Sequence, residues 1–295
     1  MSACIATVGT FDGFHKGHQD LIEQLRDIAK ERGLKTRIIT FSNHPLEVIA
    51  PERAPKLLFR RSYVIEKLEN CDVDRVSVIN FTAELAALTA REFLCLLHER
   101  YDVAILLMGF NNSFGADRLA SREAYINAGK DVGVEVLYAQ EYIDEVYGVT
   151  PTSTLLRKYI SEGEIQKFQD LSEDVFVLDG IVVKGKQNGR KIGFPTFNID
   201  YDKRLAIPAK GVYSGLVSIK GHIDPAVINL GINPTIGEGN QLTLEVHAID
   251  RRYGNCYGEY AEVVFTKKIR DEQKFNSLDE LKKAIADDVK TVRNS

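Results

Sequence analysis

The stretch VGTFDGFHKGH, residues 8–18, directs the interpretation of the first half of the chain. The apolar run IATV (5–8) leads through a glycine-containing loop into a segment with helical periodicity. A strand that enters a helix in this way presents free backbone N–H groups and the positive end of the helix dipole to an anion. His15 and His18 lie three residues apart, so both can face one ligand, and Gly17 lets a phosphate approach the backbone. The alternative is an ordinary helix start on the surface.

The rest of the first half alternates short apolar runs with helical segments. The runs, each of a length typical of a buried strand, are CIATV (4–8), RIITF (37–41), RVSVINF (75–81), VAILLMGF (103–110) and VEVLYAQ (134–140). A helix is predicted over 17–33, ended by Gly33, and Thr89 with Glu92 forms a capping box at the start of another helix. This alternation predicts a three-layer α/β domain with a parallel sheet and right-handed crossovers.

The pattern changes after about residue 172. Five β-type runs are separated by turn residues, namely FVLDGIVVKG (176–185), GVYSGLVSIKG (211–221), DPAVINLG (224–231), LTLEVHAID (242–250) and YAEVVFTKKI (260–269). They predict an antiparallel sheet or small β-barrel. A final helix is predicted with a capping box at Ser277 and Glu280 and an apolar stripe of Leu278, Leu281, Ala284, Ile285 and Val289. The expected domains are 1–168 and 173–295.

Bulk properties restrict the class of protein. A length of 295 residues favours two domains, and a net charge of −4 argues against a general nucleic-acid binder. The four cysteines contain no CxxC pair, which indicates reduced thiols in a cytoplasmic protein. The chain has no signal-peptide pattern at its start and no apolar run near the ~20 residues of a membrane span. We therefore expect neither a nucleic acid nor a membrane as a partner, and the oligomeric state stays open.

A second candidate site lies in GKQNGRKIGFPTFNI (185–199), where three glycines and a basic flank can cradle phosphates. Thr196 and Asn198 are two residues apart on an extended segment, so they face the same side, and their hard oxygen atoms suit Mg²⁺ or another hard divalent cation. A hydrogen-bonded turn explains the pair equally well. In LTLEVHAID, Glu245 alternates with apolar neighbours and faces away from the core, either as a plain exposed residue or as a functional carboxylate.

The sequence as a whole, including these residues, resembles the bacterial bifunctional riboflavin kinase/FMN adenylyltransferases, whose first half belongs to the HxGH nucleotidyltransferase superfamily. The resemblance covers nearly the whole chain in order. The segments that carry it are GTFDGFHKGH (9–18), FSNHP (41–45), GFNNSFG (109–115), TSTLLR (152–157), GKQNGRKIGFPTFNI (185–199), LTLEVHAID (242–250) and KKIRDEQKFNSLDEL (267–281).

The resemblance implies two activities and two sets of residues. The C-terminal barrel would phosphorylate riboflavin with ATP to give FMN, and the N-terminal domain would adenylylate FMN with ATP to give FAD and pyrophosphate. The ATP-binding residues implied for the adenylyltransferase are Gly9, Phe11, His15, His18, Asn111, Thr152, Ser153 and Arg157, with His15, His18 and Arg157 catalytic. The residues implied to bind ATP or flavin in the kinase are Gly185, Gly189, Arg190, Gly193, Pro195, Thr196, Asn198 and Arg270, with Thr196 and Asn198 as metal ligands.

Several of these assignments have a structural alternative. Glu245 is implied as the general base of the kinase, because the ribityl hydroxyl of riboflavin is a poor nucleophile, whereas the adjacent His247 is expected to be structural. His44 fits either a turn or the first site. Arg157 is either a phosphate ligand or a surface residue, and Arg270 is either a ligand-binding residue close to Phe275 or the ion-pair partner of Asp271 or Glu272.

The chain departs from the family pattern at two points. Asn112 replaces an aromatic residue, and Pro151-Thr152 replace an apolar–serine pair. Two other functions are considered: an HxGH nucleotidyltransferase for another phosphate ester, and a flavin-binding regulator with little turnover. The kinase-type residues Thr196, Asn198 and Glu245 argue against the first, and retention of both residue sets argues against the second.

Overall fold

The computed structural model describes residues 3–185, 189, 192–233 and 241–294. The chain forms two compact units, Met1–Ser153 and Thr154–Ser295. Helices α7 (Ser153–Glu162) and α8 (Ile165–Ser172) therefore belong almost entirely to the second unit. The domain limits of 1–168 and 173–295 stay a prediction.

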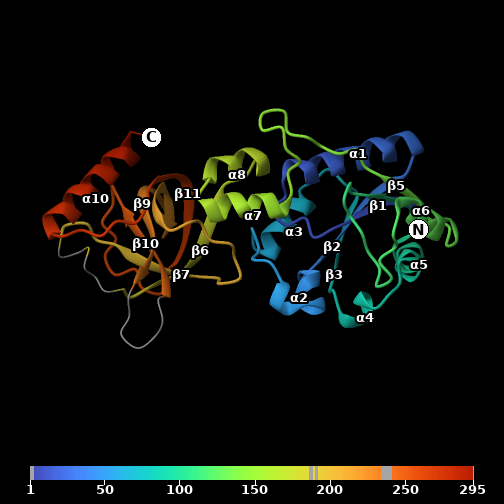
Figure 1. Ribbon diagram of the computed structural model, residues 1–295, viewed down its shortest axis with the longest axis horizontal. Helices are drawn as coiled ribbons and strands as arrows, with labels where there is room; N and C mark the ends of the chain where they lie inside the picture. Colours follow the sequence, from blue (N-terminus) through green and yellow to red (C-terminus); the bar gives the residue numbers. More distant parts are fainter. Residues whose placement is uncertain (1–2, 186–188, 190–191, 234–240, 295) are drawn as a thin grey trace. The chain divides into compact units, whose positions relative to one another are not determined.

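The first unit contains a five-stranded sheet in the order β3-β2-β1-β4-β5, and every neighbouring pair of strands is parallel (Figure 1). The strands are β1 (Cys4–Val8), β2 (Lys35–Phe41), β3 (Arg75–Ile79), β4 (Val103–Met108) and β5 (Glu135–Tyr138). The predicted parallel α/β domain is confirmed. Because β2 and β4 flank β1 on opposite sides, the topology reverses between β1 and β4, which is where open α/β sheets usually bind ligands.

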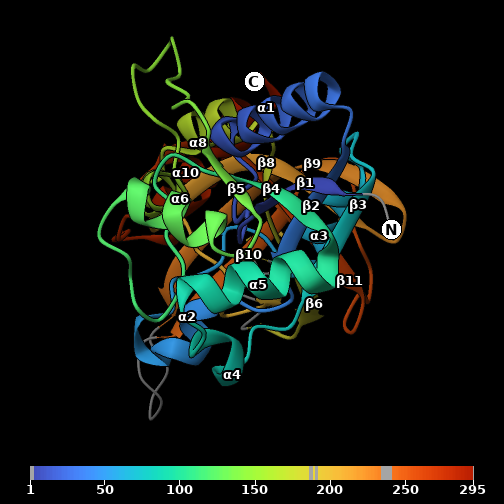
Figure 2. The same ribbon diagram turned by 90° about the vertical axis from the view of Figure 1, so that its right-hand side faces the viewer.

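The helices of the first unit cover both faces of this sheet. They are α1 (Lys16–Arg32), α2 (Pro45–Ile49), α3 (Arg61–Glu69), α4 (Ala83–Ala86), α5 (Ala90–Tyr101) and α6 (Arg122–Lys130), with a 3₁₀ turn, η1 (Pro51–Arg53). Figure 2 shows α1 and α5 on opposite sides of the strands. Gly33 ends α1 in the left-handed conformation, and Thr89 and Glu92 form the reciprocal capping box of α5, so both predicted helix signals are confirmed.

The second unit is a closed antiparallel barrel in the order β10-β7-β6-β11-β8-β9, which confirms the predicted barrel. Its strands are β6 (Phe176–Val183), β7 (Phe197–Tyr201), β8 (Gly211–Ile219), β9 (His222–Asn233), β10 (Gln241–Ala248) and β11 (Tyr260–Arg270). Phe168 of α8 stacks edge-on against Phe176 inside this unit, and Gln169 donates a hydrogen bond to the carbonyl of Phe265. Helix α8 is thus fixed to strands β6 and β11.

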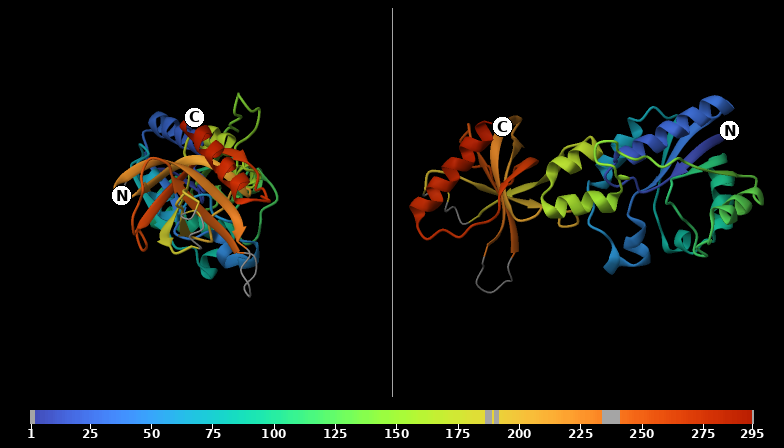
Figure 3. Two further views of the ribbon diagram at one scale, coloured as in Figure 1. Left: turned by 90° about the vertical axis from the view of Figure 1, so that its left-hand side faces the viewer. Right: turned by 45° about the horizontal axis from the view of Figure 1, so that its top comes forward.

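The terminal helix α10 (Leu278–Arg293) lies along the barrel (Figure 3). Two predictions for it are wrong in detail. The Ser277 hydroxyl accepts from the Glu280 N–H, but the Glu280 carboxylate accepts from the N–H of Asn276, so the capping box is not reciprocal. Leu278 is 65% exposed, because α10 meets the barrel core through its C-terminal half at Val289 and Val292.

All four cysteines are free thiols. Among the described residues, every helix is too short or too polar to cross a membrane.

Candidate active sites

The structure brings His15 and His18 together at the carboxyl end of β1. His15 is the N-cap residue of α1, and His18 lies in its first turn. Their rings stack with centroids 3.7 Å apart and planes 18° from parallel. The Phe11 ring, 1% exposed, packs against His18 at a centroid distance of 5.2 Å, so the side chain of Phe11 supports the pair from the core. Any contact of Phe11 with a nucleotide would have to come from its backbone.

Burial keeps both imidazoles uncharged. It lowers the pKa of His15 to about 4 because the imidazolium form loses hydration. The pKa of His18 is well below its ordinary value of 6.5, first through burial and second through repulsion from His15. At neutral pH the pair therefore offers hydrogen bonds rather than positive charge. The Nδ1 atoms of both rings are buried without a hydrogen-bond partner in the described chain, an arrangement that folded proteins rarely leave without a functional reason.

The loop that carries the pair is strained. Phe11 and Phe14 have φ angles of 51° and 33°, in the left-handed region that non-glycine residues seldom adopt. Each such residue costs about 1–2 kcal/mol, and such strain persists only where surrounding contacts enforce it. Here Phe14 N–H donates to the Phe11 carbonyl, and Gln19 donates from its side chain to the Phe14 carbonyl. Backbone strain of this kind concentrates at functional sites.

The segment that precedes α7 packs against this loop. The Ser153 hydroxyl donates to the Asp12 carbonyl at 2.7 Å, and a Cβ atom built on Gly17 would lie 3.3 Å from the Pro151 carbonyl oxygen. Residues 151–153, including Thr152, thus lie beside the histidine loop. Arg157, the other predicted residue of this motif, lies further along α7 in the second unit, so its role at this site stays a prediction.

Three residues of this site escaped the sequence interpretation. The Asp12 carboxylate, 1% exposed, accepts the N–H of Leu58 at 3.1 Å. Lys16, between the two histidines, forms an ion pair at 3.0 Å with Asp144, whose side chain is 3% exposed. Asp144 also accepts the N–H groups of a following turn. Asp12 and Lys16 stand within the motif, but their partners are 46 and 128 residues away in the chain.

The departure from the family pattern at Asn112 has a structural explanation. The Asn112 side chain donates to the carbonyl of Val8, the last residue of β1, at 3.3 Å. This short amide joins the loop that follows β4 to the end of β1, across the reversal point of the sheet.

Three other residues considered for this site lie nearby in the chain or the sheet. Asn111 is exposed beside Asn112, and Gly9 donates its N–H to the Ile39 carbonyl in β2. His44 caps α2, because its Nδ1 accepts the N–H of Leu46.

The second site forms on the barrel, where β7 and β10 pair. Asn198 and Glu245 stand directly opposite each other in the antiparallel register, so their side chains share a face. Leu244 and Val246 are fully buried, which confirms that Glu245 points away from the core. Thr196, just before β7, lines the same cavity of about 280 Å³ as Glu245. His247 makes a 2.8 Å hydrogen bond with the Pro195 carbonyl, in agreement with a structural role.

Glycines bring a loop close to this pair. A Cβ atom on Gly185 would lie 2.0 Å from the Asn198 side-chain nitrogen. A Cβ atom on Gly189 would lie 2.2 Å from the Phe194 carbonyl and 3.2 Å from the Thr196 hydroxyl. Gly193 adopts a φ of 92°, which favours glycine. Arg190, which was also predicted to bind here, lies outside the described residues.

Arg270 lines the cavity, and its ion-pair partner is neither of the acidic neighbours that the alternative interpretation considered. It donates two hydrogen bonds to the Asp288 carboxylate of α10, at 2.9 and 2.8 Å, whereas Asp271 offers it only a carbonyl. The alternative interpretation, an ion pair with Asp271 or Glu272, is therefore wrong, and the ligand-binding role of Arg270 stays a prediction. The reason is that α10, which packs against β8 and β9, brings the buried carboxylate of Asp288 to the guanidinium at the end of β11. Leu281 and Ile285 of the same helix form an apolar wall of the cavity.

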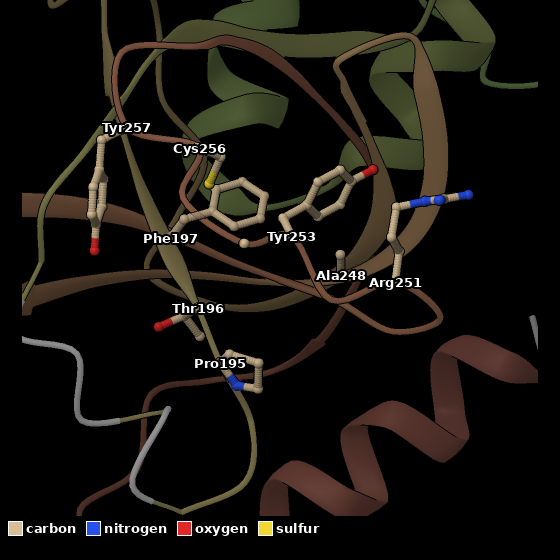
Figure 4. A pocket seen from close by; sticks show the side chains of 9 residues that line it. Pro195, Thr196, Phe197, Ala248, Arg251, Tyr253, Cys256 and Tyr257 are labelled. Carbon is tan, nitrogen blue, oxygen red and sulfur yellow. The ribbon is translucent and has the colours of Figure 1, made fainter.

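A second, smaller cavity adjoins Thr196 (Figure 4). The rings of Phe197 and Tyr253 meet there edge-on at 6.1 Å. Asp224, 6% exposed, accepts hydrogen bonds from the Arg251 side chain and the Tyr253 hydroxyl, and so fixes both on this wall. Thr196 borders both cavities. The described residues contain no cluster of three or more His, Cys, Asp or Glu side chains that could hold a metal, so a metal here would depend on the hard oxygens of Thr196 and Asn198.

Comparisons with known proteins match both units. A family model described as FAD synthetase matches residues 1–153, and one described as riboflavin kinase matches residues 171–295. The bifunctional riboflavin kinase/FMN adenylyltransferase of Escherichia coli K12 is 37% identical, over 98% of this chain and 92% of that protein. The Pseudomonas fluorescens protein of the same description is 36% identical over 98% of this chain and 92% of that protein. A crystal structure described as a macrolide-efflux protein from Streptococcus pneumoniae has 30% identity and a TM-score of 0.85, and the match covers 100% of this chain and 95% of that one.

The buried histidines predict a pH-dependent stability of the first unit. The unfolded chain binds a proton at His15 near pH 6.5, whereas the folded site binds it only near pH 4. The low pKa of His15 therefore does not reduce the free energy of unfolding above pH 6.5. The reduction grows as the pH falls and is complete below pH 4, where His15 alone accounts for about 3 kcal/mol. Calorimetric unfolding between pH 7 and pH 5 should show a smaller decrease in stability for a His15→Gln/His18→Gln variant. Equal decreases in both proteins would contradict the burial argument.

Proposed function

Because the chain belongs to the bifunctional riboflavin kinase/FMN adenylyltransferase family, we propose that its barrel makes FMN from riboflavin and that its α/β unit makes FAD from that FMN. The observation that supports this assignment is a separate group of polar side chains in each unit, of residue types suited to bind phosphates. One is the histidine pair at the start of α1, and the other is the Thr196–Asn198–Glu245 group. Family membership also argues against an HxGH enzyme for another phosphate ester.

In the kinase, Glu245 acts as general base toward the terminal hydroxyl of the ribityl chain. An alcohol is a weak nucleophile, and a positioned carboxylate that accepts its proton contributes about 10²–10⁴-fold to such a transfer. Glu245 is suited to this because it faces Asn198 across the strand pair, on the open side of β10. Thr196 and Asn198 would hold Mg²⁺ or another hard divalent cation, which when bound neutralises charge on the transferred phosphoryl group.

The two cavities suggest how the kinase substrates meet. We assign the flavin ring to the larger cavity, because Phe275, Leu281 and Ile285 give it apolar walls and the Arg270–Asp288 pair closes one side. The donor nucleotide approaches from the smaller cavity, where Tyr253 and Tyr257 line the wall. Thr196 borders both cavities, so the phosphoryl group would pass beside its hydroxyl.

In the adenylyltransferase, the phosphate of FMN attacks the α-phosphorus of ATP and pyrophosphate leaves. The nucleophile is already ionised, so the site needs no general base, only donors and positive charge around the phosphates. Neutral His15 and His18 would serve as hydrogen-bond donors, together with the free N–H groups at the start of α1. An arriving triphosphate favours the charged imidazolium and would raise the pKa of both rings from their low values. Arg157 is assigned as a further cation.

The modular assignment predicts opposite effects of two variants. Glu245→Ala should reduce FMN formation about 10²–10⁴-fold while FAD synthesis from supplied FMN continues. Changing His15 and His18 to Ala should do the reverse. Each variant is incubated with ATP, Mg²⁺ and either riboflavin or FMN, and the flavins are separated chromatographically over time. Loss of both activities in either variant would refute independent sites.

A smaller change tests the glycine loop of the kinase. In Gly185→Ala the new methyl group would lie 2.0 Å from the side-chain nitrogen of Asn198, so either the loop or the metal-ligating amide must move. We expect riboflavin phosphorylation to decrease at least about tenfold, because a shift of about 1 Å at a catalytic group can cost 10²-fold. The adenylyltransferase rate of the same preparation serves as the control. An unchanged kinase rate would show that Asn198 is not needed where the structure has it.

A further inference from the structure

Arg61, the first residue of α3, spans the carboxyl ends of β1 and β2. Its Nη1 donates to the Thr10 carbonyl at 2.5 Å. Its Nη2 donates to the Thr40 hydroxyl at 2.9 Å and to the Phe41 carbonyl at 2.5 Å, and its Nε also donates to the Phe41 carbonyl at 3.1 Å. One guanidinium group thus joins three oxygen atoms on two different chain segments.

Both segments belong to the candidate adenylyltransferase site. Thr10 precedes the strained residue Phe11, in the loop that ends at His15. Phe41 is the last residue of β2 and the first of FSNHP. The guanidinium group therefore holds the histidine loop at a fixed distance from the end of β2. A loop with non-glycine residues in the left-handed conformation requires such contacts with the surrounding structure to keep that conformation.

The charge of Arg61 has no direct counterion among the described residues, since every hydrogen-bond acceptor it has there is neutral. Burial lowers the pKa of its guanidinium group, opposed by the more distant carboxylates of Asp12 and Glu47, but an arginine in a protein stays protonated. A half-buried cation bound only to neutral oxygens keeps much of its electrostatic field. That field acts at the edge of the sheet where His15 and His18 are themselves uncharged.

We propose that Arg61 is a positioning residue for adenylyl transfer, which holds the histidine loop in its strained conformation and supplies fixed positive charge at the phosphate-binding edge of the sheet. The inference rests on the proposed function of the first unit. A lysine cannot replace this arrangement, because an ammonium group lacks the planar fork that reaches both strand ends together.

The experiment compares Arg61→Ala, Arg61→Lys and wild type in FAD formation from FMN, ATP and Mg²⁺. We expect Arg61→Ala to lower kcat about 100-fold, with a smaller change in KM for ATP, because a misplaced loop acts mainly on the transition state. Guanidinium ion, added well below denaturing concentration, should restore kcat of Arg61→Ala at least about tenfold by occupying the vacated site. Arg61→Lys should remain at least about tenfold below wild type.

Two controls separate this role from a general loss of structure. Riboflavin phosphorylation by the same Arg61→Ala preparation should stay near the wild-type rate, which reports on the second unit. Arg91→Met removes an exposed arginine at the start of α5, and its FAD synthesis should be unchanged. Calorimetry of Arg61→Ala should retain the unfolding transition of the first unit.

The outcomes are distinguishable. If wild type makes FAD and Arg61→Ala does so at the same kcat, the Arg61 inference is wrong and the proposed function stands. If Arg61→Ala loses activity together with its unfolding transition, and guanidinium ion restores nothing, Arg61 is only a structural residue and the inference is again wrong. If wild type itself makes no FAD from FMN and ATP, the proposed function fails, and the Arg61 inference fails with it.

Discussion

The central position of β1 in the parallel sheet is the constraint on which the first site depends. With β2 on one side and β4 on the other, the loops that follow all three strands converge at one edge. Hydrogen bonds connect these segments. Asn112 donates to the last residue of β1, and Arg61 donates both to the loop after β1 and to the end of β2. A histidine pair on an isolated helix start would have neither neighbour. The sheet order is what makes it a site.

The barrel arranges its site by register instead of by strand order. Pairing of Glu245 with Asn198 fixes a carboxylate opposite an amide, and closure of the barrel leaves that register no freedom to slip. Glycines at 185 and 189 then let a loop pass close to Asn198 and Thr196. In the proposed function, the two units therefore bind phosphates by different physical means. The first would use a helix start with uncharged rings, and the second would use hard oxygen ligands beside a carboxylate.

Local patterns in the sequence were sufficient to predict much of this structure. Apolar runs predicted β1 and β10, Gly33 and the Thr89–Glu92 box fixed two helix ends, and alternation placed Glu245 on the open face. Contacts between distant segments could not be predicted in the same way. The Lys16–Asp144 pair, the Arg270–Asp288 pair and the three acceptors of Arg61 depend on packing that no local period encodes. The apolar stripe of α10 could be predicted from the sequence. Its role as a wall of the cavity could not, because it depends on where the helix packs against the barrel.

The electrostatics of the first site follow from this packing. Stacking two rings 3.7 Å apart under the cover of Phe11 excludes water, and water is what would stabilise their charged forms. Positive charge that does not depend on pH must then come from groups that do not titrate near neutrality, such as lysine, arginine, a helix N-terminus or a metal. Lys16, between the two histidines, is already paired with Asp144. Arg61 meets that requirement with acceptors that do not neutralise it. An enzyme built in this way can bind a polyphosphate without first protonating its histidines, and the charge of the bound substrate can then raise their pKa within the complex.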